Sequence, residues 1–310
     1  MTFSVSGVAI NPAYLIAIGF VVGILGGFFG VGGSFLAGPA LFAVGVPMNF
    51  VVGTDLAHIV GKSIVAARKH RTLGNIDFKL GMIMVVGTIA GVEAGARLIQ
   101  HLKKTAHVDV AVGFTFIVVL LGISSFMTWE SIKTLRTHGR AKSGRGPKHE
   151  HPSRRDLSAA SHISRAIHRI SLPPYVSLPV SGVSRVSLWA ILMVAFVGGF
   201  FSGFLGGGAG YIRMPCLIYL LGIPTHIAVG TDLFEIIISA SYGTFTHALK
   251  GNVDILIALV MHTGAAIGAQ IGATSTQFFG GPRIRMAFIP LPLIGAVILI
   301  HGLLAGHPAK

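Results

Sequence analysis

Ionisable side chains stand at helical spacing within an apolar stretch of the first half of the chain. Asp55, His58 and Lys62 occupy positions i, i+3 and i+7, so they share one face if residues 53–68 form a helix. A charged group in such surroundings is unfavourable unless it is paired, and it therefore marks a candidate site. Together these side chains can bind an anion, exchange a proton or hold a cation.

The corresponding face of a later stretch carries Asp232, Glu235 and Ser239, and Arg213 lies upstream of it. Neither Lys62 nor Arg213 sits at an obvious helix end, so we expect both cations to contact an anionic substrate. The alternative is that their long side chains reach out to the polar surface of a membrane.

Some of these residues are suited to binding a coupling ion. His58, Glu235 and Glu93 are the best candidates for exchanging a proton, because imidazole titrates near neutral pH and a buried carboxylate can also do so. Asp55 or Asp232 can instead help to hold Na⁺.

Helix capping is the competing explanation for the aspartates. Each follows a Gly-Thr pair, so Thr54 or Asp55 and Thr231 or Asp232 can simply cap helix N-termini. Glu235, three residues after Asp232, would then reach back as in a capping box.

Two glycine-rich breaks precede these stretches, and we expect them to line a substrate site. Unpaired N–H groups at the start of a half-helix attract negative charge, and only glycine lets the backbone come close to a ligand. The alternative is plain helix packing. The residues expected to bind substrate in these breaks are Gly30, Gly32, Gly33 and Ser34, and Gly206, Gly207, Gly208 and Gly210.

The two breaks belong to an internal duplication at an offset of 176 to 177 residues. The segment VGTDL at residues 52–56 recurs at 229–233, and His70, Gly74, Asn75 and Asp77 recur as His247, Gly251, Asn252 and Asp254. Each copy predicts an apolar run, a break, a short proline-containing piece, a segment that contains the triplet Gly-Thr-Asp (53–55 and 230–232, here called the triplet segment) and two full spans. If the break turns the chain back, each copy has five passes and the copies are inverted; if it is a kink, each has four and they are parallel.

Composition requires a membrane around these elements. The chain has 310 residues, is 52% hydrophobic and only 11% charged, and its mean hydropathy is +0.77, whereas about 25% charged is ordinary for soluble domains. We therefore predict an all-α polytopic membrane protein of the bacterial inner membrane, with eight to ten membrane elements and two pseudo-symmetric repeats that each contain a glycine-broken helix. The distribution of basic residues favours the inverted arrangement. The predicted divisions are a first repeat at 1–130, a linker at 131–187 and a second repeat at 188–310.

The predicted linker holds 11 of the 24 lysines and arginines against two acidic residues. Its polar composition predicts a largely flexible cytoplasmic segment. We expect it to contact anionic lipid head groups rather than nucleic acid, because no aromatic residues interleave its basic ones. Nothing in the sequence indicates an oligomeric state.

The sequence predicts neither an enzyme nor a metal or other cofactor site. A hydrolase built on Ser34, His58 and Asp55 is not expected, because Ser34 recurs as Gly210 and His58 as Glu235. No close cluster of His, Cys and carboxylate residues has metal-ligand spacing.

The duplicated pattern resembles the sulfite exporter TauE/SafE family. The features that carry the resemblance are the glycine break, Pro39, the Gly-x-Pro at 45–47, Val-Gly-Thr-Asp-Leu, and His-x-x-x-Gly-Asn-x-Asp at 70–77, repeated about a basic loop. It covers nearly the whole chain apart from residues 1–12 and the linker, and it implies a secondary transporter that moves small sulfur-containing or organic anions, commonly outward. In this family the aspartate of the triplet is often serine, and the linker of this chain is unusually long.

We therefore predict export of a small anion such as sulfite, an organosulfonate or a carboxylate by alternating access, with H⁺ or Na⁺ as a possible coupling ion. The alternatives are a passive anion channel and a membrane sensor or scaffold that acts through the basic linker.

Overall fold

The computed structural model describes residues 2–304 except residue 4, residues 105–107 and residues 142–171, and these residues are mostly helical. Seven helices among them are long and apolar enough to cross a membrane. The chain is therefore a multi-pass protein of the cell membrane, as its composition predicted. These candidate spans are Pro12–Phe29, Met48–Thr72, Phe78–Lys103, Val108–Glu130, Leu188–Leu205, Ile255–Phe278 and Gly281–Leu304.

The first half, residues 2–141, starts with a small two-stranded hairpin and continues as five helices. Asn11 caps the first helix, whose first residue is a proline, and Gly30 ends it with a left-handed backbone conformation. The elements are β1 (Thr2–Phe3), β2 (Val8–Ala9), α1 (Pro12–Phe29), α2 (Ser34–Ala43), α3 (Met48–Thr72), α4 (Phe78–Lys103) and α5 (Val108–Ala141).

The second half, residues 172–304, follows a similar order of elements. Its glycine break contains a 3-10 turn, and its short helix continues into a π-helical turn. The elements are β3 (Tyr175–Leu178), β4 (Val183–Ser187), α8 (Leu188–Leu205), η1 (Gly207–Ala209), α9 (Gly210–Pro215), η2 (Cys216–Leu220), α10 (Thr225–Leu249), α11 (Ile255–Ser275), η3 (Thr276–Phe278), α12 (Gly281–Phe288) and α13 (Pro290–Leu304).

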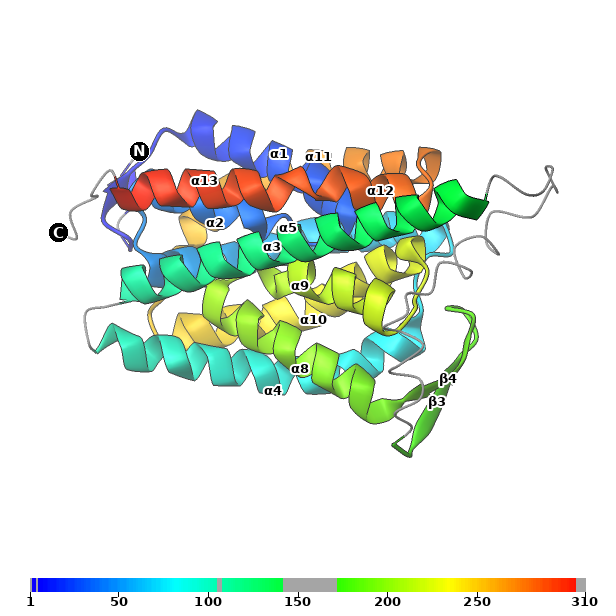
Figure 1. Cartoon of the computed structure of the whole chain (residues 1–310). Coiled ribbons are helices and arrows are strands. Elements are labelled where there is room, and N and C mark those ends of the chain that lie inside the picture. Colours follow the sequence, from blue (N-terminus) through cyan, green and yellow to red (C-terminus); the bar gives the residue numbers. More distant parts are fainter. Residues whose placement is uncertain (1, 4, 105–107, 142–171, 305–310) are drawn as a thin grey trace.

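The helices run along one bundle axis, and the two halves start at opposite ends of it (Figure 1). Helix α1 begins and α13 ends at one end, whereas α5 ends and the β3–β4 hairpin lies at the other. An odd number of passes in the first half produces this arrangement, which is the one required when the break turns the chain back. The internal duplication itself stays a prediction from the sequence.

Stripes of glycine bring helices from different halves into backbone contact. Helix α1 packs along α11, and α4 packs along α8. A Cβ atom on any of these glycines would overlap the backbone of the partner helix, so the close approach requires them. They are Gly19, Gly23 and Gly27 of α1, Gly264, Gly268 and Gly272 of α11, Gly87, Gly91 and Gly95 of α4, and Gly199 and Gly203 of α8.

The two triplet helices begin earlier than the sequence pattern suggested. Helix α3 begins at Met48 and α10 at Thr225, each directly after a proline, so Asp55 and Asp232 lie well inside their helices. The capping explanation for these aspartates, and the capping box with Glu235, is therefore wrong. Asp77 and Asp254 are the capping aspartates, and they accept hydrogen bonds from the first-turn N–H groups of α4 and α11.

Each triplet threonine accepts a hydrogen bond from the capping aspartate of the other half. The hydroxyl of Thr231 accepts the N–H of Asp77 at 2.9 Å, and that of Thr54 accepts the N–H of Asp254 at 2.9 Å. All four residues are buried. These links join α10 to the start of α4 and α3 to the start of α11, so the central helices are fastened to the opposite half.

A hairpin serine completes each of these links. Ser6 donates to Asp254 Oδ2 from its backbone N–H at 3.1 Å and its hydroxyl at 2.9 Å, and the Ser181 hydroxyl donates to Asp77 Oδ2 at 2.7 Å. These hairpins were not predicted from the sequence, although Ser-Gly-Val recurs at 6–8 and 181–183. Residues 142–171 of the predicted linker, which carry most of its basic side chains, lie outside the described residues.

Candidate functional site

The two glycine breaks meet in the middle of the bundle. The hydroxyl of Ser34, the first residue of α2, donates to the carbonyl oxygen of Gly207 at 2.8 Å, and both groups are buried. Gly207 has a φ of +73°, and a Cβ atom there would collide with Ser34, so this crossing needs glycine. A Cβ atom on Gly210 would likewise lie 2.6 Å from Val31 Cα.

Other break glycines pack against the triplet helices. A Cβ atom on Gly30 would lie 2.6 Å from Val229 Cα, and one on Gly206 would lie 3.0 Å from Val52 Cα. These two glycines support helix packing, the alternative weighed from the sequence. The glycines of the breaks that have a positive φ are Gly30, Gly32, Gly33, Gly206, Gly207 and Gly208.

Both triplet carboxylates lie beside the second break. A Cβ atom on Gly207 would lie 3.0 Å from Asp55 Oδ2, and one on Gly210 would lie 2.6 Å from Asp232 Oδ2. Asp55 therefore reaches across from the first half, and the packed pair α3 and α10 presents one carboxylate from each half to the place where the breaks cross.

Asp55, His58 and Lys62 form a buried row along α3, as their spacing predicted. His58 Nδ1 lies 3.4 Å from Asp55 Oδ1 and 3.4 Å from Lys62 Nζ, and each side chain is about 1% exposed. His58 Nε2 has no hydrogen-bond partner among the described residues. No carboxylate of the described chain lies within ion-pair distance of Lys62, so its charge is not neutralised by direct contact.

Arg213 lies in a different environment from Lys62. Its Nε donates to Asp232 Oδ1 at 2.7 Å, its NH1 pairs with Glu235 Oε2 at 2.5 Å, and all three side chains are fully buried. The stem of Arg213 passes over Gly198 of α8, where a Cβ atom would overlap it. In this conformation Arg213 is held by carboxylates of its own half rather than left free for a substrate.

Glu93 does not lie with the other predicted coupling residues. It accepts a hydrogen bond from Arg97 Nε at 2.7 Å and another from the Tyr242 hydroxyl at 3.2 Å, near the exposed face of α4. Lys250 interacts with it electrostatically, and partial burial lowers the pKa of that lysine. The remaining predicted residue, Ser239, donates to Glu235 Oε2 at 3.3 Å.

Two further residues join the site, and sequence analysis assigned neither a role. The ring of His262 on α11 lies over Gly61, where a Cβ atom would collide with it, and it interacts electrostatically with Lys62. Tyr211 interacts electrostatically with Asp55, and its buried hydroxyl has no hydrogen-bond partner among the described residues. A polar side chain inside an apolar stretch was the available signal for both.

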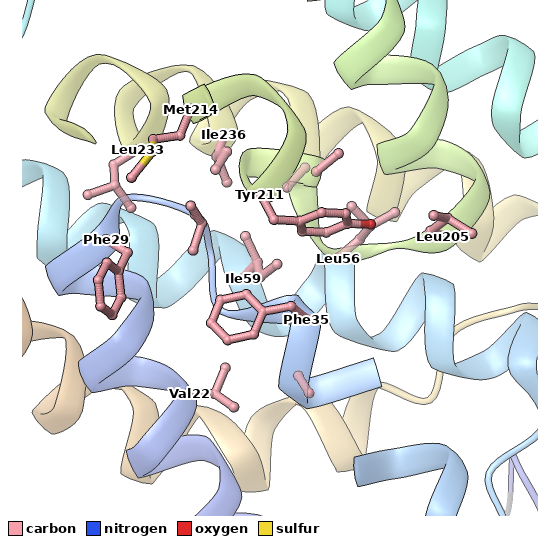
Figure 2. Packing of buried hydrophobic residues seen from close by; sticks show 14 of the residues in the cluster. Val22, Phe29, Phe35, Leu56, Ile59, Leu205, Tyr211, Met214, Leu233 and Ile236 are labelled. Carbon is pink, nitrogen blue, oxygen red and sulfur yellow. The ribbon is translucent and has the colours of Figure 1, made fainter. Parts of the chain in front are cut away.

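Apolar side chains from both halves pack together around the middle of the bundle, as Figure 2 shows. Val22, Phe29, Phe35, Leu56 and Ile59 come from the first half, and Leu205, Tyr211, Met214, Leu233 and Ile236 come from the second. This shell lowers the local dielectric and so strengthens each charge interaction within it. Among the described residues, no group of three His, Cys, Asp or Glu side chains is arranged to hold a metal ion.

Comparison with known proteins agrees with this architecture. The family profile described as "Sulfite exporter TauE/SafE" matches residues 15–299. No solved structure gives a significant match.

Several curated proteins are similar to the chain. It is 24% identical over 298 residues to the probable membrane transporter protein YunE of Bacillus subtilis, covering 93% of this chain and 97% of that protein. It is 31% identical over 111 residues to the probable membrane transporter protein YdhB of the same organism, covering 36% and 45%. It is 24% identical over 289 residues to the probable membrane transporter protein MJ0441 of Methanocaldococcus jannaschii, covering 88% and 89%.

Proposed function

The chain belongs to the sulfite exporter TauE/SafE family of membrane transporters, and on that premise we propose that it exports a small anion. The proposed substrates are sulfite, organosulfonates and related sulfur-containing or carboxylate anions, all of which present oxyanions to the same donors. The proposed mechanism is secondary transport by alternating access, with no cofactor.

The observation that carries this proposal is the buried ammonium group of Lys62. It sits in the middle of a membrane helix, and no carboxylate of the described chain pairs with it directly. Because such a charge is costly without a partner, an anionic ligand stabilises it. Arg213, already paired with two carboxylates, is a weaker candidate for direct contact with the anion.

His58 supplies a second donor for the anion. When its Nδ1 accepts a hydrogen bond from Lys62, the ring hydrogen is on Nε2, which has no partner among the described residues. An ammonium group and an imidazole N–H on successive turns of α3 suit an oxyanion. His262, beside Gly61, adds a polar group near Lys62 from α11.

The buried carboxylates near the crossing, together with the imidazole of His58, are the proposed coupling sites. Asp55, His58, Asp232 and Glu235 are all buried and come from the two packed helices α3 and α10. H⁺ and Na⁺ are both candidate coupling ions. Glu93 is left out of this proposal, because it lies near the exposed face of α4 with Arg97.

Alternating access would come from movement of one group of helices against another. The helix pairs α1–α11 and α4–α8 each join the two halves through glycine stripes, and hydrogen bonds link α3 to α11 and α10 to α4, so each pair can move together with its linked central helix. The basic linker is proposed to contact anionic lipid head groups, which attract clusters of lysine and arginine.

The test is uptake of radiolabelled sulfite, a small sulfonate and a small carboxylate into proteoliposomes, with and without an imposed pH gradient. Lys62→Ala should abolish saturable uptake while leaving the amount of folded protein unchanged. Lys69→Ala is the matched control, because Lys69 lies at the end of the same helix and is only half-buried. Normal transport by Lys62→Ala would refute the assignment of the anion site.

The same assay separates the other functions. Flux that ignores every imposed H⁺ or Na⁺ gradient and does not saturate indicates a channel. No flux of any of these anions would contradict the proposed substrate class. A sensor that acts through the linker would tolerate Lys62→Ala but not deletion of residues 142–171.

A further inference from the structure

One buried cluster of side chains contains more acidic than basic groups. It consists of Arg213, Asp232 and Glu235 and is here called the Arg213 cluster. Two carboxylates face a single guanidinium, and all three side chains are 0% exposed. With both carboxylates ionised, the cluster carries one net negative charge inside the membrane domain. A buried charge of this kind is neutralised most readily by binding a proton.

Charges on the neighbouring elements do not remove this excess. On α3, the charged groups nearest to the cluster are Asp55 and Lys62, with His58 between them, and neither forms an ion pair with the cluster among the described residues. Even with Lys62 protonated, the two groups together contain three carboxylates and two cations.

Within the part of the chain that the structure describes, the remaining elements packed against α10 add no cation to the cluster. Helix α4 contributes the Thr88 hydroxyl, which lies near Glu235 and donates to the Met84 carbonyl oxygen at 3.0 Å, and η2 contributes the Cys216 thiol. On α12, the guanidinium of Arg285 lies 5.8 Å from the ring centroid of Tyr219 and forms no ion pair with the cluster among the described residues.

Unused hydrogen-bonding atoms on the cluster show where a proton can bind. Asp232 Oδ2 and Glu235 Oε1 are buried and have no hydrogen-bond partner among the described residues. On the same guanidinium, NH2 also has no hydrogen-bond partner among the described residues, and NH1 is close enough to Glu235 Oε2 for an ion pair but lacks hydrogen-bond geometry. A proton on either oxygen would remove the excess charge and create a donor where there was only an acceptor.

The geometry favours a proton over a metal cation. A hard cation such as Na⁺ prefers a shell of several oxygen ligands. Here the guanidinium lies between the two carboxylates and repels a second cation. A proton needs only one carboxylate oxygen, so the cluster can hold it without rearrangement.

We propose that Asp232 and Glu235 share one exchangeable proton, and that this proton is the coupling ion for the anion bound near Lys62. The step is simple: water on one side of the membrane gives a proton to a carboxylate oxygen, and water on the other side takes it back. No covalent bond between heavy atoms changes. The assignment of coupling rests on the transport function proposed above, whereas the proton site itself does not.

The proton site is tested on purified protein in lipid bilayers, without any substrate, by infrared difference spectroscopy during a pH titration. A carboxylic acid band should appear on acidification in the wild type and be lost in both Asp232→Asn and Glu235→Gln. It should persist in Glu93→Gln, the matched control, which changes a carboxylate bonded at the edge of α4. A titrating band that survives in both Asp232→Asn and Glu235→Gln overturns the proposal.

The coupling is tested by accumulation of radiolabelled sulfite in proteoliposomes with an imposed pH gradient of either sign at zero membrane potential. An acidic exterior drives uptake together with the proton, and an acidic interior drives uptake in exchange for it, which is the mode that export against an inward proton gradient requires. One proton per monovalent anion predicts about tenfold accumulation per imposed pH unit, because each unit is a factor of ten in proton activity. Glu235→Gln should lose this accumulation, and Glu93→Gln should keep it.

The two experiments test the proton site and the transport function independently. If the wild type moves no anion but the carboxyl band titrates as expected, the proposed transport function fails and the proton site stands. If the wild type accumulates sulfite and both Asp232→Asn and Glu235→Gln accumulate it equally well, the proton assignment is overturned. Size-exclusion chromatography of each variant confirms that the comparison is between folded proteins.

Discussion

Replacing Arg213 by methionine should destabilise the protein more than any surface substitution. The change keeps a long apolar stem over Gly198 but removes the only ion-pair partner of Asp232 and Glu235 among the described residues. Two buried carboxylates then remain without a counter-ion. Breaking a buried ion pair by removing one partner costs about 3–5 kcal/mol of unfolding free energy.

That loss corresponds to a factor of about a hundred to several thousand in the ratio of folded to unfolded protein. The loss of unfolding free energy should grow as the pH rises. The folded variant relieves its two carboxylates by binding protons that the unfolded chain does not bind, so its stability falls with increasing pH. The measurement is reversible unfolding in mixed detergent micelles, at several pH values, followed by circular dichroism.

Two further variants separate this explanation from a general packing defect. Arg213→Met combined with Asp232→Asn and Glu235→Gln should recover more than half of the lost stability, because the buried charges are removed together. Arg97→Met is the matched surface control: its ion pair with Glu93 involves an arginine that is 75% exposed, so a change within about 0.5 kcal/mol is expected.

The reasoning fails if Arg213→Met is as stable as the wild type at neutral pH. It also fails if the triple variant is no more stable than Arg213→Met alone. In either case the carboxylates would not depend on Arg213 for their charge balance.

The links between the halves give two further predictions. Thr231→Val leaves the buried N–H of Asp77 without its acceptor and should cost about 1–3 kcal/mol of unfolding free energy, whereas Thr231→Ser should cost much less. Thr54→Val should have a similar effect through Asp254. Strongly unequal losses of stability in thermal unfolding would contradict the matched roles of the two threonines. Ser181→Ala removes the hydroxyl that donates to Asp77 and should cost about 1 kcal/mol of unfolding free energy. Hydrogen exchange of the β3–β4 amides should become faster, and unchanged exchange would show that this hydrogen bond does not hold the hairpin in place.

The membrane character, the helical class and the glycine breaks could be predicted from the sequence, because each depends on local composition. A run of apolar residues long enough to span a bilayer identifies a helix wherever it packs. The row Asp55, His58 and Lys62 was likewise predictable, since residues at i, i+3 and i+7 share a helix face regardless of their partners.

The start of the triplet helices was not predictable from the Gly-Thr-Asp pattern. An aspartate after Gly-Thr resembles an N-cap, but the structure uses Asp77 and Asp254 as caps and starts α3 and α10 at Met48 and Thr225. The threonine hydroxyl is occupied by the capping residue of the opposite half. A contact across more than 150 residues leaves no local trace.

Tertiary structure also decided which cation is free. From the sequence, Lys62 and Arg213 were equivalent candidates for an anion. In the folded chain, α9 brings Arg213 against two carboxylates of α10, whereas Lys62 faces an imidazole. The identity of a charged residue determines that it needs a partner in a membrane, but only the packing of distant helices determines which partner it has.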